Sequence, residues 1–209
     1  MQDIKETSSY RIALRDKILD MAMSSFMQHG IRAVKMDDIA QQLAISKRTL
    51  YEIYGDKEEL LYQSIRKYDQ QRAAYLAHYA AEGHHVIDII IEAYRRRVKE
   101  VHMVNPLFYE DIMKYPKVEE YIMEAHEKTR SDFYDFMQQG VKEGLLRPDI
   151  DYTIISHLLD AIGEYVMSNQ LLRRYSVEQL FANFFLVSLR GICTEQGVKT
   201  LDAAMAKIQ

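Results

Sequence analysis

Residues 36–55 read MDDIAQQLAISKRTLYEIYG, a pattern of two short helices joined by a tight turn. The first helix, expected over 36–44, opens with two aspartates, where the helix dipole favours carboxylates, and continues with apolar residues at helical spacing. Ser46 is a good N-cap for the second helix, 47–54, and Gly55 ends it. Two short helices in this arrangement predict a helix-turn-helix.

Helical periodicity continues over most of the remaining chain. Eight glycines and three prolines in 209 residues leave few turns. Proline is tolerated only at the start of a helix, so Pro106 and Pro116 bracket a short segment. The chain is therefore predicted to be all-α. The other expected helices span 10–29, 56 to about 82, 86–104, 107–115, 118–143, 152–174, 176–196 and 201–208.

Length and composition exclude several classes of protein. A chain of 209 residues with 48% hydrophobic and 28% charged residues is typical of a globular protein with a sizeable core. No apolar run approaches the roughly 18 residues of a membrane span, and the polar N-terminal segment does not resemble a secretory signal. We therefore expect a cytoplasmic protein. Cys193 is the only cysteine, which excludes an internal disulfide.

The charge differs between the two parts of the chain. Residues 1–57 hold nine lysines and arginines against eight aspartates and glutamates, whereas the remainder is acidic and the whole chain carries a net charge of −4. An acidic body repels DNA. Any contact with DNA must therefore come from a small, locally basic surface near the N-terminus.

The first turn of the 47–54 helix carries that basic surface. A helix fits the major groove of DNA and can present its N-terminal side chains to base edges. Lys47 and Arg48 supply donors for guanine or phosphate, Thr49 can serve a base or the backbone, and Tyr51 offers a hydroxyl one turn later.

A series of short motifs extends over about fifty residues of the N-terminal region. They are ILDMA at 18–22, Phe26, Gly30, DIA at 38–40, ISKRTLY at 45–51 and KEEL at 57–60. Through these motifs, which occur in the family's order and with nearly its spacing, the region resembles the TetR family of bacterial transcriptional regulators.

The resemblance implies roles for particular residues. Tyr51 and Lys57 fall on positions that contact phosphates in the family, and the first turn of the 47–54 helix falls on the base-reading turn. Two departures stand out: Lys35 and Met36 replace the usual threonine cap, and Ile53 and Tyr54 replace a frequent histidine and phenylalanine. The candidate DNA-binding residues are Lys35, Ser46, Lys47, Arg48, Thr49, Tyr51 and Lys57.

The resemblance also implies two domains and a small-molecule effector. Residues 1–55 would form the three-helix DNA-binding domain, and residues 56–209 a helical domain for effector binding and dimerisation. Methionine and aromatic walls suit an adaptable pocket for an apolar or aromatic effector, although such residues at helical spacing are also typical of a plain core. The candidate effector-binding residues are Tyr94, His102, Met103, Phe108, Tyr109, Met113, Tyr121, His126, Phe133 and Met137.

Family logic places a homodimer interface on the last two long helices. Each carries an apolar stripe broader than a surface helix needs, although burial within one subunit would account for half of these residues, and periodicity does not separate the two explanations. The resulting dimer would read a near-palindromic DNA operator, and the resemblance implies a repressor because repression is the family's usual mode. The candidate interface residues are Ile155, Leu158, Leu159, Ile162, Val166, Leu180, Phe181, Phe184, Phe185 and Leu189.

Two other classes of function are weighed against this interpretation. Glu82 and His85 have the spacing of a helical carboxylate–histidine metal pair, but Gly83 breaks the helix between them and no second pair occurs. No catalytic motif is present, so we expect no catalytic residue, no metal and no cofactor. The other alternative is an all-α dimeric interaction protein, in which the basic turn binds an acidic partner instead of DNA.

Overall fold

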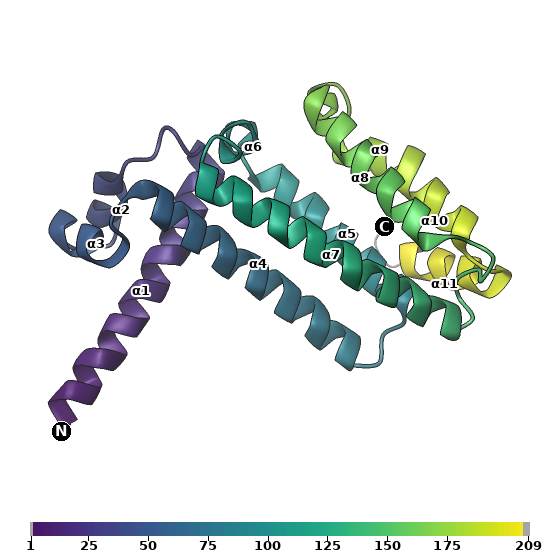
Figure 1. The fold of residues 1–209 in the computed structure, drawn as a ribbon, viewed down its shortest axis with the longest axis horizontal. Helices are drawn as coiled ribbons and strands as arrows, with labels where there is room; N and C mark the ends of the chain where they lie inside the picture. The colour runs from purple at the N-terminus through teal and green to yellow at the C-terminus, as the bar shows by residue number, and fades with distance from the viewer. Residues whose placement is uncertain (1, 207–209) are drawn as a thin grey trace. The chain divides into compact units, whose positions relative to one another are not determined.

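The computed structural model describes the backbone of residues 2–206, and all of their side chains except those of residues 2–9, 126, 130, 131 and 167. The described residues fold into helices and connecting loops, which confirms the all-α prediction (Figure 1). None of their helices is long and apolar enough to cross a membrane. The helices of the N-terminal half are α1 (Gln2–His29), α2 (Met36–Gln42), α3 (Lys47–Tyr54), α4 (Lys57–Ala81) and α5 (Val86–Met103).

The C-terminal half differs from the prediction in its helix boundaries. The helix expected over 152–174 ends at Ser168, and a 3₁₀ turn follows at 171–173. The segment expected as one helix, 176–196, ends at Ile192, where Cys193 is extended, and the last helix begins at Glu195 instead of 201. The helical run over 177–192 contains a π-helical turn, η2 (Phe181–Phe185). Three aromatic side chains in that turn lower the intrinsic preference for a regular α-helix. The remaining elements are α6 (Pro106–Ile112), α7 (Pro116–Lys142), α8 (Tyr152–Ser168), the 3₁₀ turn η1 (Leu171–Arg173), α9 (Val177–Leu180), α10 (Leu186–Ile192) and α11 (Glu195–Ala206).

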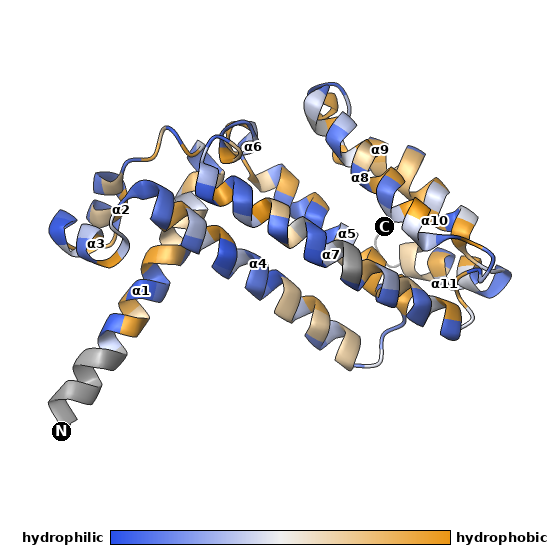
Figure 2. Ribbon diagram, viewed as in Figure 1, coloured by the Kyte–Doolittle hydropathy of each residue, from blue (hydrophilic) through white to orange (hydrophobic). Residues whose placement is uncertain are grey.

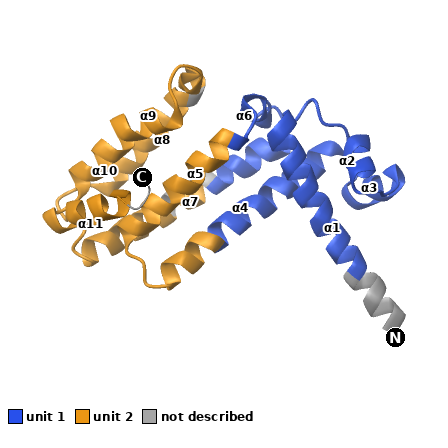
Figure 3. Ribbon diagram, turned by 180° about the vertical axis from the view of Figure 1, so that it is seen from behind, with its two compact units in different colours: residues 1–74, 103–125 blue, residues 75–102, 126–209 orange. Residues whose placement is uncertain are grey.

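Packing divides the chain into two compact units (Figure 3). The first unit joins residues 1–74 with 103–125, and the second joins 75–102 with 126–209. The expected boundary at residue 55 separates a DNA-binding domain from a domain for effector binding and dimerisation. This functional division stays a prediction. Apolar and polar residues alternate along the helices of both units, as is typical of amphipathic helices (Figure 2).

The core of the first unit combines the helix-turn-helix with later helices. Phe26, Ile39 and Leu50, from α1, α2 and α3, are fully or almost fully buried there. Phe108 of α6 and Val118 of α7 belong to the same cluster. The N-terminal head, residues 1–57, therefore depends on α6 and α7 for its core as well as on its own first three helices.

The core of the second unit lies between α5, α7 and the C-terminal helices. Ile87 and Leu146 are fully buried in it, and Tyr152 donates its hydroxyl hydrogen to the carbonyl of Arg147 at 2.7 Å. Gly140 lies close against Leu146, so a side chain larger than hydrogen would not fit there without movement.

Candidate nucleic-acid interface

The turn between α2 and α3 is held by local hydrogen bonds. Ser46 caps α3 as predicted: its Oγ accepts the backbone N–H of Thr49 at 3.0 Å and lies 2.8 Å from the Thr49 hydroxyl. Ala44 adopts a positive φ of 52° within the turn. Leu50 is fully buried on the inner side of α3. The opposite side of α3 is therefore fixed as an outward surface.

Two cations of the first turn of α3 stand on that outward surface, each beside a carboxylate. Lys47 Nζ lies 2.8 Å from Asp37 Oδ1, which belongs to the first turn of α2. Arg48 is 86% exposed, and its Nε donates to Glu52 Oε1 at 2.7 Å, one turn further along α3. Both cations are therefore exposed at the surface of the protein.

The two tyrosines of α3 have different surroundings. Tyr51 is exposed and keeps its hydroxyl at the surface, with Lys47 Nζ 5.8 Å from the centre of its ring. Tyr54 is buried, and its hydroxyl donates to the backbone carbonyl of Arg15 at 3.0 Å. Burial raises the pKa of Tyr54, so this hydroxyl stays protonated as a donor. Tyr54 therefore ties α3 to α1, where phenylalanine could not make the hydrogen bond.

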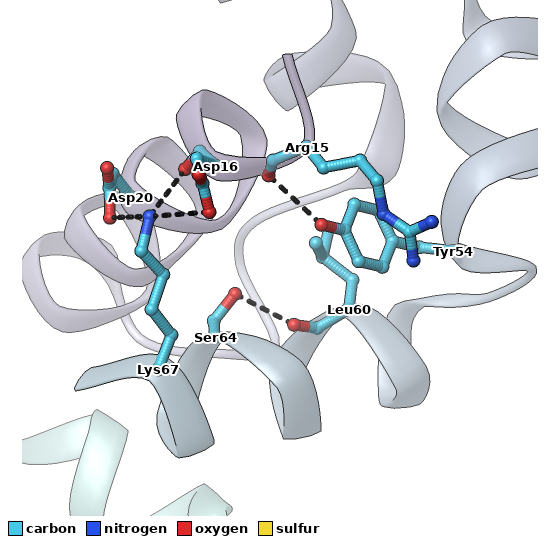
Figure 4. A network of polar contacts seen from close by, with 7 residues as sticks. All are labelled: Arg15, Asp16, Asp20, Tyr54, Leu60, Ser64 and Lys67. Carbon is cyan, nitrogen blue, oxygen red and sulfur yellow. Dashed lines mark hydrogen bonds and ion pairs between the residues drawn. The ribbon is translucent and has the colours of Figure 1, made fainter. Parts of the chain in front are cut away.

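The same region of α1 is also tied to α4 (Figure 4). Lys67 Nζ lies 2.9 Å from Asp20 and 3.3 Å from Asp16, one turn apart on α1. Burial alone lowers the pKa of Lys67, but its hydrogen bonds to the two carboxylates outweigh this effect and raise it. The end of α3 and the first half of α4 therefore share α1 as a common support.

The remaining two DNA-binding candidates differ in exposure. Lys35 is exposed at the start of α2, where its backbone N–H donates to Asp38 Oδ2 at 2.8 Å. This carboxylate supplies one of the two hydrogen bonds of a capping box, and the other would need a hydroxyl at position 35. Lys57 is half-buried, with its Nζ 6.0 Å from the centre of the Phe26 ring, and desolvation lowers its pKa. Lys57 is therefore a less accessible phosphate contact than Lys47 or Arg48.

The effector-binding candidates fall in both units. Met103, Phe108, Tyr109, Met113 and Tyr121 belong to the first unit, where Phe108 is buried in the core of the head and Met103 and Met113 are exposed. The structure does not bring the whole candidate set together within one unit.

Three candidates of the second unit lie in or against the core of that unit, namely Tyr94, Phe133 and Met137. Tyr94 stacks on Phe181, Met137 is buried and Phe133 is half-buried. His102 is exposed, and its Nε2 lies 2.5 Å from a carboxylate oxygen of Glu178. The side chain of His126 lies outside the described residues.

The dimer candidates also separate by exposure. Phe181 and Leu189 are buried in the core of their own unit, so they offer no surface to a partner. Leu158 and Phe184 are exposed. The other six are half-buried, namely Ile155, Leu159, Ile162, Val166, Leu180 and Phe185.

The exposed apolar stripe of α8 was predicted only at Leu158. It consists of Ile154, Leu158 and Tyr165, which are 56%, 54% and 59% exposed, and Val187 on α10 is 62% exposed. The spacing of 154, 158 and 165 is helical, but the neighbouring stripe that begins at Ile155 is longer and more apolar. Periodicity alone favoured the stripe that is half-buried.

The alternative metal site is not formed. α4 ends at Ala81, and Gly83 follows with φ of +91°, so Glu82 and His85 share no helix. Glu82 faces His78 and His84, while His85 lies 3.6 Å from Glu143. Among the side chains that the structure describes, no cluster of histidine, cysteine and carboxylate groups could hold a metal ion.

Known proteins are similar to this chain both in the N-terminal head and over most of its length. The family model described as bacterial regulatory proteins, tetR family, matches residues 18–63. The HTH-type transcriptional regulator UidR of Escherichia coli strain K12 is 27% identical over 183 residues, which cover 86% of this chain and 93% of that protein. The HTH-type transcriptional repressor KstR2 of Mycobacterium tuberculosis strain H37Rv is 25% identical over 198 residues, covering 88% and 94%.

Solved structures share the fold. The ketosteroid transcriptional regulator KstR2 of Mycobacterium tuberculosis has a TM-score of 0.56 at 21% identity, over 87% of this chain and 95% of that one. A putative transcriptional regulator from Saccharomonospora viridis, solved in complex with choline, has a TM-score of 0.67 at 17% identity, over 88% and 99%. At such identities the likeness shows the helical architecture.

Proposed function

Because the chain belongs to the TetR family of bacterial regulatory proteins, we propose that it reads a near-palindromic DNA operator as a homodimer and leaves the operator when a small molecule binds. Its curated relatives are named transcriptional regulators and repressors. The name of KstR2 favours repression as the mode of this chain, and access to DNA would require the chain to act in the cytoplasm.

The first turn of α3 carries the proposal. Ser46 caps the helix, Leu50 anchors its inner side, and Lys47 and Arg48 project from its outer side. This is the geometry in which a recognition helix presents N-terminal donors to the major groove. Tyr51 and Lys57 are the proposed phosphate contacts, and Thr49 can serve either role.

The homodimer is proposed to form on the second unit. The exposed stripe of Ile154, Leu158 and Tyr165, together with Phe184 and Val187, gives this unit an apolar surface that a second copy can cover. Two copies are needed because a palindrome has two half-sites about 34 to 36 Å apart.

The effector is proposed to be apolar or aromatic and to bind among the aromatic and methionine side chains of the second unit. Tyr94, Phe133 and Met137 are the residues that support this choice. Such a ligand weakens DNA binding only if it prefers a conformation that binds the operator poorly, since equal affinity for both conformations shifts nothing.

Selection of duplexes from a random DNA pool tests the proposal. The full chain should enrich a near-palindromic sequence. Arg48→Ala should then weaken binding to that sequence by about 1 to 3 kcal/mol and relax preference at one or two positions of each half-site.

The matched variant is Lys57→Ala. Loss of a phosphate contact should weaken selected and unrelated duplexes alike and lower the slope of log affinity against log salt by about one. Failure of the intact protein to enrich any duplex contradicts the proposed function. A change of sequence preference in Lys57→Ala, with the salt slope unchanged, contradicts the division of roles.

A further inference from the structure

Each of the two exposed cations in the first turn of α3 is already bound to a carboxylate in the free protein. Lys47 contacts both oxygens of Asp37, at 2.8 and 2.9 Å, across the turn from α2. The hydrogen bond to Asp37 and the charge of that carboxylate raise the pKa of Lys47. Arg48 contacts Glu52 within α3. The surface that would face DNA therefore carries two negative charges beside its two reading cations.

These carboxylates affect different kinds of DNA unequally. Binding to an unrelated duplex depends almost entirely on cations that neutralise phosphates. A carboxylate beside such a cation competes with the phosphate for it and repels the phosphate chain. At an operator, hydrogen bonds from the same cation to base edges offset that penalty, because they form only with the correct sequence.

The charge balance of the head makes the effect important. Residues 1–57 carry only one more positive than negative charge. The local field at the first turn of α3 therefore depends strongly on its two nearest carboxylates. Asp37 and Glu52 are 57% and 52% exposed, so both remain at the surface and add to the field that an approaching duplex meets.

We propose that Asp37 and Glu52 are specificity-determining residues, which hold the reading cations in the free protein and thereby suppress binding to DNA that lacks the operator sequence. The inference rests on the proposed function, since Lys47 and Arg48 must contact DNA for their partners to matter. Asp37 and Glu52 would act on specificity without contacting a base and without packing in the core.

The test begins with the duplex that the intact protein selects from a random pool. Failure to select any duplex contradicts the proposed function itself, before the inference is reached. With a duplex in hand, fluorescence anisotropy measures the affinity of the full chain for it and for a scrambled duplex of equal length and composition, over a series of KCl concentrations. The variants are Asp37→Asn, Glu52→Gln and the double substitution.

Each single variant should bind the scrambled duplex about two- to five-fold more tightly, as expected for release of an exposed ion pair of up to about 1 kcal/mol. The selected duplex should gain less, so the ratio of the two affinities falls. The salt slope for the scrambled duplex should steepen by up to about one for each released cation. A purely structural role of the carboxylates would not change this slope.

Two carboxylates of the second unit serve as matched controls. Asp149 and Asp202 are exposed and are bound to Arg147 and Arg190. Asp149→Asn and Asp202→Asn change the net charge by the same amount and should alter either affinity less than two-fold. Equal tightening in these controls would reduce the effect to net charge and overturn the proposal.

Two further results would also overturn it. One is an unchanged affinity of both head variants for the scrambled duplex. The other is weaker binding of Glu52→Gln to the selected duplex with altered base preference, because Glu52 would then be reading a base itself. Thermal unfolding of each variant verifies that the fold is retained.

Discussion

The absence of a side chain at Gly197 determines how closely two segments of the second unit approach. A Cβ atom there would collide with the backbone carbonyl of Leu145 and lie 3.1 Å from the Cβ of Cys193. That carbonyl already accepts the N–H of Thr194 at 3.0 Å, so it cannot move freely. Gly197→Ala should therefore lower the free energy of unfolding by about 2 kcal/mol or more, measured by urea denaturation.

Gly163 provides the opposite case and the control. It lies in α8, and no heavy atom lies within 4 Å of the Cβ that a substitution would add. Gly163→Ala should raise the free energy of unfolding by about 0.5 to 1 kcal/mol, because alanine loses less backbone entropy in a helix. Equal effects of the two substitutions would contradict the close approach at Gly197.

The thiol of Cys193 is buried, and burial raises its pKa from 9.0 to about 11. Between these values the thiol ionises in the unfolded chain but stays neutral in the folded one. Its contribution to stability is therefore complete below pH 9 and is lost as the pH rises toward 11. Chemical denaturation at pH 8 and pH 11 should show wild type losing about 2 kcal/mol more than Cys193→Ala over this interval. Parallel losses would show that the thiol is not shielded.

Single residues also show what the sequence can predict. The cap by Ser46 and the stop at Gly55 were predictable because capping depends on neighbours within a few positions. The pairing of Asp37 with Lys47 was not, since the two residues lie in different helices and meet only after the turn has formed. The exposed cationic residues of the head were predictable from the sequence, but the carboxylates that they contact were not.

Among the helices, α1 is the element that links the head to the following helix. It receives the hydroxyl hydrogen of Tyr54 from α3 and the ammonium group of Lys67 from α4 (Figure 4). Lys67→Met should leave Asp16 and Asp20 as an unrelieved pair of like charges one turn apart. We expect the free energy of unfolding to fall by about 1 kcal/mol at low salt and by less at 1 M salt, where the repulsion is screened.

Lys67→Arg is the control for this element, since it retains the cation and should remain close to wild type. Urea denaturation of both variants at two salt concentrations makes the comparison. A loss in Lys67→Met that does not depend on salt would indicate that the methylene chain of Lys67, and not its charge, supports α1.

Helix existence was predictable, but helix orientation was not. Nearly every expected helix is present because apolar spacing and proline positions are local signals. Which side of α8 faces inward depends on the shape of its neighbours, and the stripe at Ile155 was preferred over the exposed stripe at Ile154. Likewise, Phe108 was assigned to an effector pocket, whereas α6 contributes it to the core of the head.

For the whole molecule, function is proposed to depend on pairing two copies through the second unit. Leu158 and Val187 are more than half exposed in the single chain, so a charged substitution there costs its fold little. In the dimer the same substitution would bury a charge in an apolar interface, which costs far more. Leu158→Glu and Val187→Glu should therefore be folded monomers, measured by sedimentation or light scattering.

Met123→Glu is the matched control, because Met123 is 63% exposed on α7 in the first unit and outside the proposed interface. It should remain a dimer. The monomeric variants should bind a single half-site as wild type does, but lose most of their preference for the complete palindrome, since only a dimer can engage both half-sites at once. A Leu158→Glu protein that remains dimeric with unchanged affinity for the palindrome would place the interface elsewhere on the chain.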